Sequence, residues 1–221
     1  MHSNAIATYK NKLKLTSRQQ EILVGTLLGD GHLETQDHGR TYRLKIEHTL
    51  KQKEYVDWIH NEFREWVLTL PKVRERFVRL RSVSGIYPKY YFNTLSSGSF
   101  RFCAQQFYRK GNKVVPQLIH RWLTPLVLAV WYMDDGSIKS KHHRTVFLNT
   151  QGFDLQSMER LQSALLKKFG IKTNTRKDRD GMQLYVIGET IERFLTLIEP
   201  FVIPSMRYKL PKVWLTQLPK R

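Results

Sequence analysis

Cysteine is nearly absent from this sequence, and no long hydrophobic run is present. The single cysteine, Cys103, excludes a disulfide framework and a cysteine-based zinc site, and it is interpreted as a small core residue rather than a nucleophile. No apolar run approaches the roughly 18 residues of a membrane span, and residues 1–15 contain no signal-peptide core. We therefore expect a soluble intracellular protein with no membrane partner.

Acidic residues are also scarce, since 19 Asp and Glu stand against 37 Lys and Arg, giving a net charge of +18. This excess favours a polyanionic partner, because each neutralised phosphate releases condensed counterions. Hydrophobic residues make up 41% of the chain, enough for one large or two small cores, so a disordered basic tail is excluded. Nucleic acid is the expected partner, although charge alone does not separate a passive binder from an enzyme.

One apolar segment ending in Asp-Gly occurs twice. Residues 23–31 (LVGTLLGDG) align without gaps on residues 128–136 (LAVWYMDDG), so Asp30 and Asp135 occupy matching positions almost half a chain length apart. An Arg-Thr pair follows each copy, at residues 40–41 and 144–145. The two halves are therefore interpreted as duplicated units.

Both copies are predicted to be helices with recognisable start signals. Thr16 or Ser17 precedes the first copy in capping-box register with Gln19 or Gln20, and Thr124 with Pro125 precedes the second. We expect Gly31 and Gly136 to end these helices in the left-handed conformation.

A small-residue face is predicted to bring the two helices together. Gly25 and Gly29 lie four residues apart on one face, which permits close approach of a second backbone. Val130 and Asp134 occupy the matching places in the other copy, so the pairing is expected to be tight but asymmetric. Asp134 competes with Asp135 as a candidate carboxylate, but it is interpreted as a group of the helix interface or as a support for the neighbouring site, because Gly29 holds the matching place.

Alternating sequence after each helix predicts strands. Residues 40–48 place Tyr42, Leu44 and Ile46 toward a core, and residues 76–81 repeat the pattern with Val78 and Leu80 inward, pairing with 89–93 across a Ser84-Gly85 turn. The second half has strands at 144–151, 172–177 and 182–187, the last two forming a hairpin around Asp180-Gly181. With helices at 52–66 and 155–169, each half runs helix, two strands, helix, two strands, helix.

The outward side chains of these strands are mostly basic or amide groups. An antiparallel ribbon carrying such groups fits the major groove of DNA, where they read base edges. The residues that we predict to contact DNA are Arg40, Arg43, Lys45, Glu47, Arg79, Arg81, Lys89, Asn149, Gln151, Lys172, Asn174 and Arg176.

The two matching aspartates suggest a chemical role. An acid at a helix C-terminus is disfavoured by the helix dipole, and two carboxylates brought together repel unless a cation lies between them. Mg²⁺ is the hard, oxygen-preferring ion that fits, and beside a DNA backbone it could activate water and stabilise the leaving oxygen. The pattern therefore predicts metal-dependent phosphodiester hydrolysis.

The duplicated segments resemble the paired motifs of LAGLIDADG homing endonucleases, in the single-chain, two-motif form of mitochondrial introns. The resemblance covers roughly residues 16–212 and rests on Leu28-Gly29-Asp30, Trp131-Tyr132-Met133-Asp134-Asp135-Gly136, Leu148-Asn149-Thr150-Gln151 and Tyr208-Lys209-Leu210-Pro211. It implies an α+β fold of two pseudo-symmetric αββαββα units joined by the two packed helices, with curved antiparallel sheets forming a DNA-binding saddle. The expected divisions are a basic arm at 1–15, a first unit with linker at 16–120, a second unit at 121–212 and a tail at 213–221.

The same resemblance implies the site and its cofactor. Asp30 and Asp135 correspond to the catalytic, metal-binding acids, one per strand cut, sharing two or three Mg²⁺ ions for which Mn²⁺ can substitute. Lys113 and Lys209 correspond to a catalytic basic residue beside each metal, although the Lys113 alignment crosses a one-residue gap. The implied protein is a monomer that cuts double-stranded DNA at a long site, located in a mitochondrion or another organelle.

Two other functions fit the same fold. One is an intron maturase that binds its own intron RNA, and the other is a DNA-binding regulator without catalysis. The presence of Asp30, Asp135 and both candidate lysines favours the endonuclease, because a pure binder has no need of two carboxylates facing phosphate.

Overall fold

The computed structural model describes residues 3–79, 84–140 and 143–216, and they form two compact units. The first comprises Met1–Gln20 and Asp30–Ala104, and the second comprises Glu21–Gly29 and Gln105–Arg221. Most of helix α2 (Ser17–Leu28) therefore packs with the second unit. The predicted division into a first unit at 16–120 and a second unit at 121–212 was drawn from the sequence repeat, and it stays a prediction. No helix in the described ranges is long and apolar enough to cross a bilayer.

Both repeated segments are helical and begin as predicted. At the start of α2, the Gln19 amide N–H donates to Thr16 Oγ1 and the Thr16 N–H donates to Gln19 Oε1, each at 3.1 Å, which is a capping box. Helix α6 (Pro125–Asp135) begins with Thr124, whose Oγ1 accepts from the Val127 N–H at 3.2 Å. Both start signals are thus confirmed.

The C-terminal part of α2 packs closely on α6 within the second unit. A Cβ atom built on Gly25 would lie 2.6 Å from Val130 Cβ, and one built on Gly29 would lie 2.4 Å from Asp134 Cβ. Real Cβ atoms essentially never approach so closely, so only glycine fits at either place. The predicted tight and asymmetric pairing, with Asp134 buried in the interface, is confirmed.

The predicted left-handed helix ends are wrong. Among the described glycines, neither Gly31 nor Gly136 has a positive φ, and Gly136 is extended at φ −75° and ψ 147°. The physical reason is that strand β7 (Gly136–Ile138) starts immediately after α6, so the backbone must extend at once. Glycine is still required, because a Cβ there would lie 2.3 Å from the Tyr132 carbonyl oxygen.

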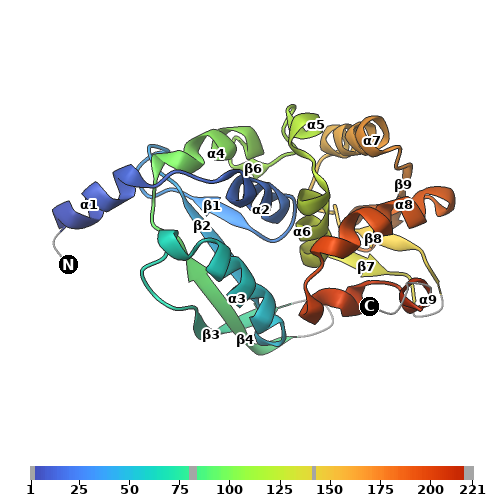
Figure 1. Ribbon diagram of the computed structural model, residues 1–221, viewed down its shortest axis with the longest axis horizontal. Helices are drawn as coiled ribbons and strands as arrows, with labels where there is room; N and C mark the ends of the chain where they lie inside the picture. Colours follow the sequence, from blue (N-terminus) through green and yellow to red (C-terminus); the bar gives the residue numbers. More distant parts are fainter. Residues whose placement is uncertain (1–2, 80–83, 141–142, 217–221) are drawn as a thin grey trace. The chain divides into compact units, whose positions relative to one another are not determined.

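The first unit contains a four-stranded antiparallel sheet with the order β1-β2-β4-β3 (Figure 1). Helix α3 packs on its β2 and β4 strands, where Leu44, Ile46 and Phe92 are buried with Val56 and Ile59. The elements are α1 (Ser3–Lys12), β1 (His32–Glu34), β2 (Arg43–Thr49), α3 (Lys53–Glu62), β3 (Lys72–Arg79), β4 (Ser84–Asn93) and α4 (Arg101–Phe107). Helix α1 lies in the segment predicted as an N-terminal arm.

Strand β3 corrects the prediction made for residues 76–81. The strand begins at Lys72, and Ser84-Gly85 lies within β4 rather than in a turn. In the sheet register, outward-facing Glu47 lies opposite Tyr91 of β4, and Tyr91 lies opposite Lys72 of β3. The outward positions of β3 are therefore Lys72, Arg74 and Arg76. Arg79 holds a register position of the opposite face, shared with Val73 and Phe77. Those apolar residues are 55% and 65% exposed because β3 is an edge strand.

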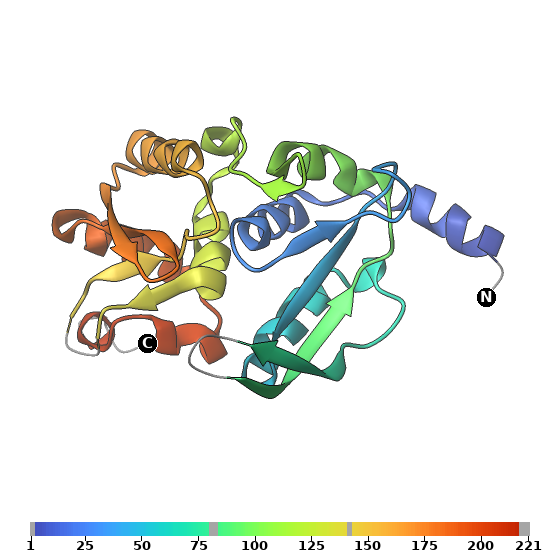
Figure 2. The same ribbon diagram turned by 180° about the vertical axis from the view of Figure 1, so that it is seen from behind.

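The second unit contains a corresponding sheet with the order β7-β8-β10-β9. Figure 2 shows these strands from the side opposite to α8. The elements after β7 are β8 (Val146–Leu148), α7 (Leu155–Phe169), β9 (Thr173–Asp178), β10 (Gly181–Val186) and α8 (Gly188–Ile198). The predicted helix at 155–169 and the hairpin are confirmed, whereas the strand predicted at 144–151 is shorter. Each half therefore has the αββαββα order, completed by α4 and α8.

Shorter elements connect the two repeats and follow the second. They are β5 (Tyr108–Arg109), β6 (Asn112–Lys113), α5 (Ile119–Trp122), a 3-10 turn (Pro204–Lys209) and α9 (Lys212–Leu215). Cys103 is buried in α4, and burial raises the pKa of its thiol to about 11, which agrees with a core residue rather than a nucleophile.

Candidate nucleic-acid interface and active site

A lysine caps the end of each repeated helix. In the second unit, the Lys113 Nζ donates to the Gly29 carbonyl oxygen at 2.6 Å, and Gly29 directly precedes Asp30. The Lys209 Nζ donates to the Asp134 carbonyl oxygen at 2.6 Å, and Asp134 directly precedes Asp135. The two lysines reach matching carbonyls although their sequence contexts differ. A cation at a helix C-terminus also interacts favourably with the helix dipole.

Both lysines are held by local structure. Lys113 ends the β5–β6 hairpin, in which it pairs with Tyr108. Lys209 ends the 3-10 turn, and its carbonyl accepts from the Tyr132 hydroxyl at 2.7 Å. The Lys209 Nζ also donates to the Met133 carbonyl oxygen at 2.5 Å. The ammonium groups are thus placed by backbone contacts before any ligand binds.

Asp30 lies in the first unit beside a buried histidine. The Asp30 Oδ2 is 3.5 Å from His48 Nδ1, and the Asp30 side chain is 51% exposed whereas that of His48 is 2% exposed. His48 lies on the inner face of β2 with Leu44 and Ile46, and its ring meets the Tyr55 ring edge-on at 5.2 Å between centroids. Sequence reasoning missed His48, although a histidine that continues an apolar alternation was a usable signal.

The equivalent position in the second unit carries a threonine. Extending the β1–β2 register aligns Gly31 with Ile46, as Gly136 aligns with Leu148, so His48 corresponds to Thr150. Thr150 is buried, and its Oγ1 bonds to the β10 backbone by accepting from the Leu184 N–H at 3.2 Å. Asp135 is half-buried at the end of α6, and its carbonyl accepts from the Asn149 N–H at 3.0 Å. The surroundings of the two acids therefore differ.

Acidic side chains hold the outward cations of the first sheet. Glu34 pairs with Arg43 and, at 2.8 Å, with Lys45, whereas Glu47 pairs with Arg74 and, at 2.6 Å, with Arg76. Burial alone would raise the pKa of Glu47, but the two arginines outweigh it and hold that pKa below its ordinary value. Glu47 is therefore ionised and orients Arg74 and Arg76, which sequence reasoning did not select.

The other predicted contacts of the first unit lie in and beside this sheet. In the sheet register, Lys89 of β4 lies between Thr49 of β2 and Arg74 of β3, so it occupies the same outward face as Arg74. Arg40 is exposed in the β1–β2 loop, and its carbonyl accepts from Arg101 Nε at 2.8 Å. The Arg79 side chain and the whole of Arg81 lie outside the described residues.

A hydrogen-bonded chain crosses the outer face of the second sheet. Arg176 Nε donates to Gln183 Oε1 at 2.7 Å, and Gln183 Nε2 donates to Asn149 Oδ1. The Arg176 guanidinium lies 3.8 Å from the centroid of the Phe147 ring, a cation–π contact. Asn149 and Arg176 are thus linked through Gln183, and sequence reasoning selected neither Gln183 nor Phe147.

The remaining predicted contacts of the second unit have separate partners. Lys172 pairs with Glu189 at 2.5 Å, and Gln151 Nε2 donates to Asp178 Oδ2 at 3.1 Å. Asn174 is exposed on β9, and its register position shares the outer face with Arg176. These groups line one sheet but do not form one cluster.

Known proteins share both the sequence pattern and this fold. The profile of the LAGLIDADG DNA endonuclease family matches residues 20–194. DNA endonuclease I-ChuI of Chlamydomonas applanata is 29% identical over 89% of this chain and 96% of its own length. Cytochrome b mRNA maturase bI2 of Debaryomyces hansenii is 28% identical over 89% of this chain and 74% of its own length.

A solved structure is similar over nearly the whole chain. The homing endonuclease I-WcaI, bound to its DNA recognition sequence, superposes with a TM-score of 0.86 and 27% identity, covering 95% of this chain and 93% of its own. Together with the duplicated Asp-Gly helices and the αββαββα order of each half, the match over residues 20–194 shows that the chain belongs to the LAGLIDADG DNA endonuclease family.

Proposed function

We propose that this protein is a homing endonuclease that hydrolyses one phosphodiester bond in each strand of a long double-stranded DNA site. The observation that carries the proposal is the matched placement of Lys113 and Lys209 on the carbonyls that precede Asp30 and Asp135. A DNA-binding regulator would need neither these lysines nor the two acids at the helix ends. Endonucleases among its relatives support the same reaction.

We assign the metal-binding role to the carboxylates of Asp30 and Asp135. Carboxylate oxygens are the ligands that Mg²⁺ prefers, and Asp30 keeps half of its side chain exposed despite its contact with His48. The donor set therefore fits Mg²⁺, with Mn²⁺ as a substitute. When bound, such a cation supplies an activated water and neutralises charge on the leaving oxygen.

The chain's own side chains position the reactants. Each carboxylate follows a backbone carbonyl that a lysine fixes, so its location is set before DNA binds. We infer that the lysine ammonium stabilises the negative charge that develops on the scissile phosphate. Because one chain supplies both acids and both lysines, we infer that it acts as a monomer, and the family resemblance leads us to expect an organellar location.

We assign sequence reading to the outer faces of the two sheets. The first presents Arg43, Lys45, Arg74 and Arg76, oriented by ionised Glu34 and Glu47. The second presents Arg176 and Asn149, which the buried Gln183 side chain links by hydrogen bonds. Arginine and amide groups of this kind make bidentate contacts with guanine and adenine in the major groove.

A randomised DNA library tests the proposed function. The protein is incubated with the library in Mg²⁺, and the ends that it generates are sequenced. We expect paired cuts on both strands within one long, partly degenerate site. Binding without any cut in Mg²⁺ or Mn²⁺ would instead favour the regulator.

A maturase is the second candidate, because one relative is named a cytochrome b mRNA maturase and spans most of this chain. The two functions make different demands on the same residues. Splicing assistance does not require Asp30 or Asp135, whereas DNA cleavage does. A fold that retains both acids and both lysines therefore favours cleavage, with RNA binding as an added property.

Replacing Lys209 by methionine is expected to slow cleavage of one strand about 100-fold, because a preorganised charge beside the developing negative charge is lost. Lys113→Met is expected to do the same to the other strand. Single-turnover cleavage with each strand labelled separately measures both effects. The Lys209→Arg variant keeps the charge and should recover part of the rate, and equal slowing of both strands by either methionine variant would contradict the pairing of lysines with strands.

Replacing His48 by threonine copies the second site into the first. We expect roughly 10-fold to 100-fold slower cleavage of the strand that depends on Asp30, because a group that orients a metal-binding carboxylate is removed. The other strand should be cut at the normal rate, so nicked DNA accumulates. Thr150→Ser serves as the control, and an unchanged ratio of the two strand rates in His48→Thr would rule out this role.

A further inference from the structure

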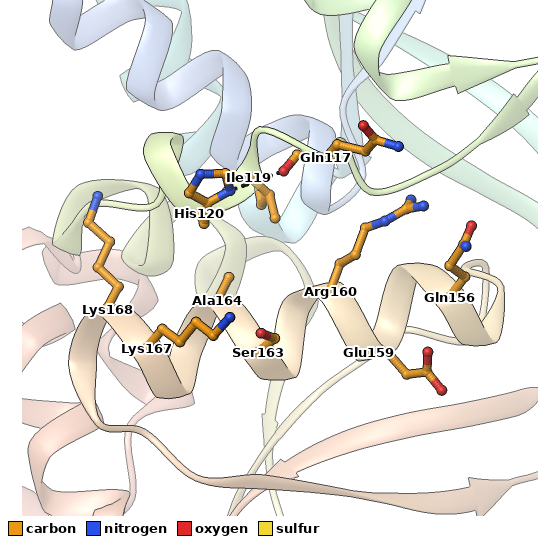
Figure 3. Close-up of a pocket in the computed structure, with 10 residues that line it drawn as sticks. All are labelled: Gln117, Ile119, His120, Gln156, Glu159, Arg160, Ser163, Ala164, Lys167 and Lys168. Carbon is orange, nitrogen blue, oxygen red and sulfur yellow. Dashed lines mark hydrogen bonds between the residues drawn. The ribbon is translucent and has the colours of Figure 1, made fainter.

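The second unit contains a groove that none of the proposed catalytic or DNA-contacting residues lines. It has a volume of about 620 Å³ and lies between α5, with the residues just before it, and α7 (Figure 3). Its lining comprises Gln117, Ile119, His120, Gln156, Glu159, Arg160, Ser163, Ala164, Lys167 and Lys168. The groove therefore needs an explanation separate from DNA cleavage.

Positive charge dominates the groove. The lining contains three cations, Arg160, Lys167 and Lys168, and only one acid, Glu159. Among the residues that the structure describes, no carboxylate forms an ion pair with these three cations. The nearby Asp154 carboxylate interacts electrostatically with Arg160 but forms no ion pair with it. The excess of positive charge in the groove therefore favours an external anion.

Two of the cations are anchored at positions along the groove. Arg160 Nη1 donates to the Val115 carbonyl at 3.0 Å, and Lys168 Nζ donates to the Arg121 carbonyl at 3.3 Å. A guanidinium has five N–H donors and an ammonium has three, so each retains donors after this contact. Anchoring to backbone carbonyls fixes both groups without neutralising them, which lowers the entropic cost of binding a ligand.

The groove and the outer sheet face lie on different sides of the second unit. Helix α7 turns Met158, Leu161 and Leu165 into the core, and its groove residues other than the buried Ala164 lie on the remaining surface. Arg176 lies on β9, Gln183 lies on β10, and Asn149 directly follows β8. A ligand in the groove therefore leaves Arg176 and Asn149 free to contact DNA.

We propose that this groove binds the sugar–phosphate backbone of single-stranded RNA. The three cations recognise phosphates, and positively charged grooves of this kind follow the backbone of single-stranded nucleic acids. Neutral groups also line it, and the amides of Gln117 and Gln156 with the Ser163 hydroxyl provide donors and acceptors for ribose 2′-hydroxyl groups. Phosphate binding alone would not need these groups.

The test separates RNA binding from DNA cleavage in the full chain. The probe is a short oligouridylate, compared with its 2′-deoxy counterpart, and the variant is Lys167→Glu combined with Lys168→Glu. We expect RNA affinity to fall at least about tenfold and the slope of log affinity against log salt to decrease by about 1.4, since two contacts to a single strand are lost. Cleavage of target DNA and the thermal unfolding midpoint should be unchanged.

A matched control carries the same change of charge elsewhere. Lys12→Glu with Lys14→Glu reverses two exposed lysines at the end of α1 and after it, in the first unit. This control should keep most of the RNA affinity. The proposal is overturned if both double variants weaken RNA binding equally, which would indicate net charge alone, or if the deoxy probe binds as tightly as RNA. If the wild-type protein cleaved no DNA, the proposed endonuclease function would be refuted. The RNA-binding measurements would still test the groove.

Discussion

Replacing Asp30 or Asp135 by asparagine is expected to abolish cleavage of one DNA strand while DNA affinity is retained. Asparagine keeps the size of the side chain but removes the negative charge that holds a divalent cation. The transition state then loses several kcal/mol of stabilisation, which corresponds to a rate decrease of roughly 1,000-fold or more. Single-turnover cleavage with separately labelled strands measures the rates, and fluorescence anisotropy measures DNA binding.

The control for the aspartate variants is Glu192→Gln, which makes the same acid-to-amide change at an exposed position of α8. This control should cut both strands at the normal rate. The double variant with both aspartates replaced should cut neither strand yet bind the site. Loss of DNA binding with normal cleavage chemistry, or normal cutting of both strands by either single variant, would contradict the assigned roles.

Replacing Gly25 by alanine is expected to destabilise the protein by about 1–3 kcal/mol or more, because the added Cβ would lie 2.6 Å from Val130 Cβ and 3.0 Å from the Val127 carbonyl oxygen. Neither α2 nor α6 can move apart freely, since residues around Val130 are fully buried. Cleavage should fall as well, because Lys113 bonds to the carbonyl of Gly29, which directly follows α2. Denaturant unfolding measures the loss of stability.

A compensating substitution tests whether the collision is the cause. Val130→Gly removes the Cβ that the introduced methyl group would meet, so the double variant should recover part of the stability lost in Gly25→Ala. The expected coupling energy is about 1 kcal/mol or more, as for residues in direct contact. Gly152→Ala is the control, since nothing lies within 4 Å of a Cβ built there. Additive effects of the two substitutions would show that Gly25 matters for another reason.

The fold was largely predictable because local signals and the repeat agreed. Thr16 with Gln19 and Thr124 with Pro125 indicate helix starts through backbone chemistry that acts within four residues. The Gly25 and Gly29 spacing predicted close helix packing, since a missing Cβ has a direct steric meaning. Helix α7 was predicted at its observed bounds because its apolar residues follow the helical period.

What could not be predicted depended on contacts distant in sequence. The prediction placed Val78 inward and Arg79 outward, because an apolar residue was expected to face the core. In the sheet register Arg79 shares the inner face with Phe77, and Phe77 is exposed because β3 is an uncovered edge strand. His48 was missed because its role depends on its contact with Asp30. Nothing in the sequence pattern links a residue near the end of β2 with the residue that follows the first repeated helix. The extended Gly136 was missed because a strand follows α6 without a loop.

The most direct test of the central claim is strand-resolved cleavage of the selected DNA site by the wild-type protein in Mg²⁺, Mn²⁺, Ca²⁺ or chelator. We predict one cut in each strand with Mg²⁺ and Mn²⁺, and binding without cutting in chelator. Ca²⁺ is expected to support binding but little cleavage, because it is larger and less strict in geometry than Mg²⁺. Cleavage at full rate in chelator, or cutting of a single strand only, would contradict a metal-dependent endonuclease with two matched acids.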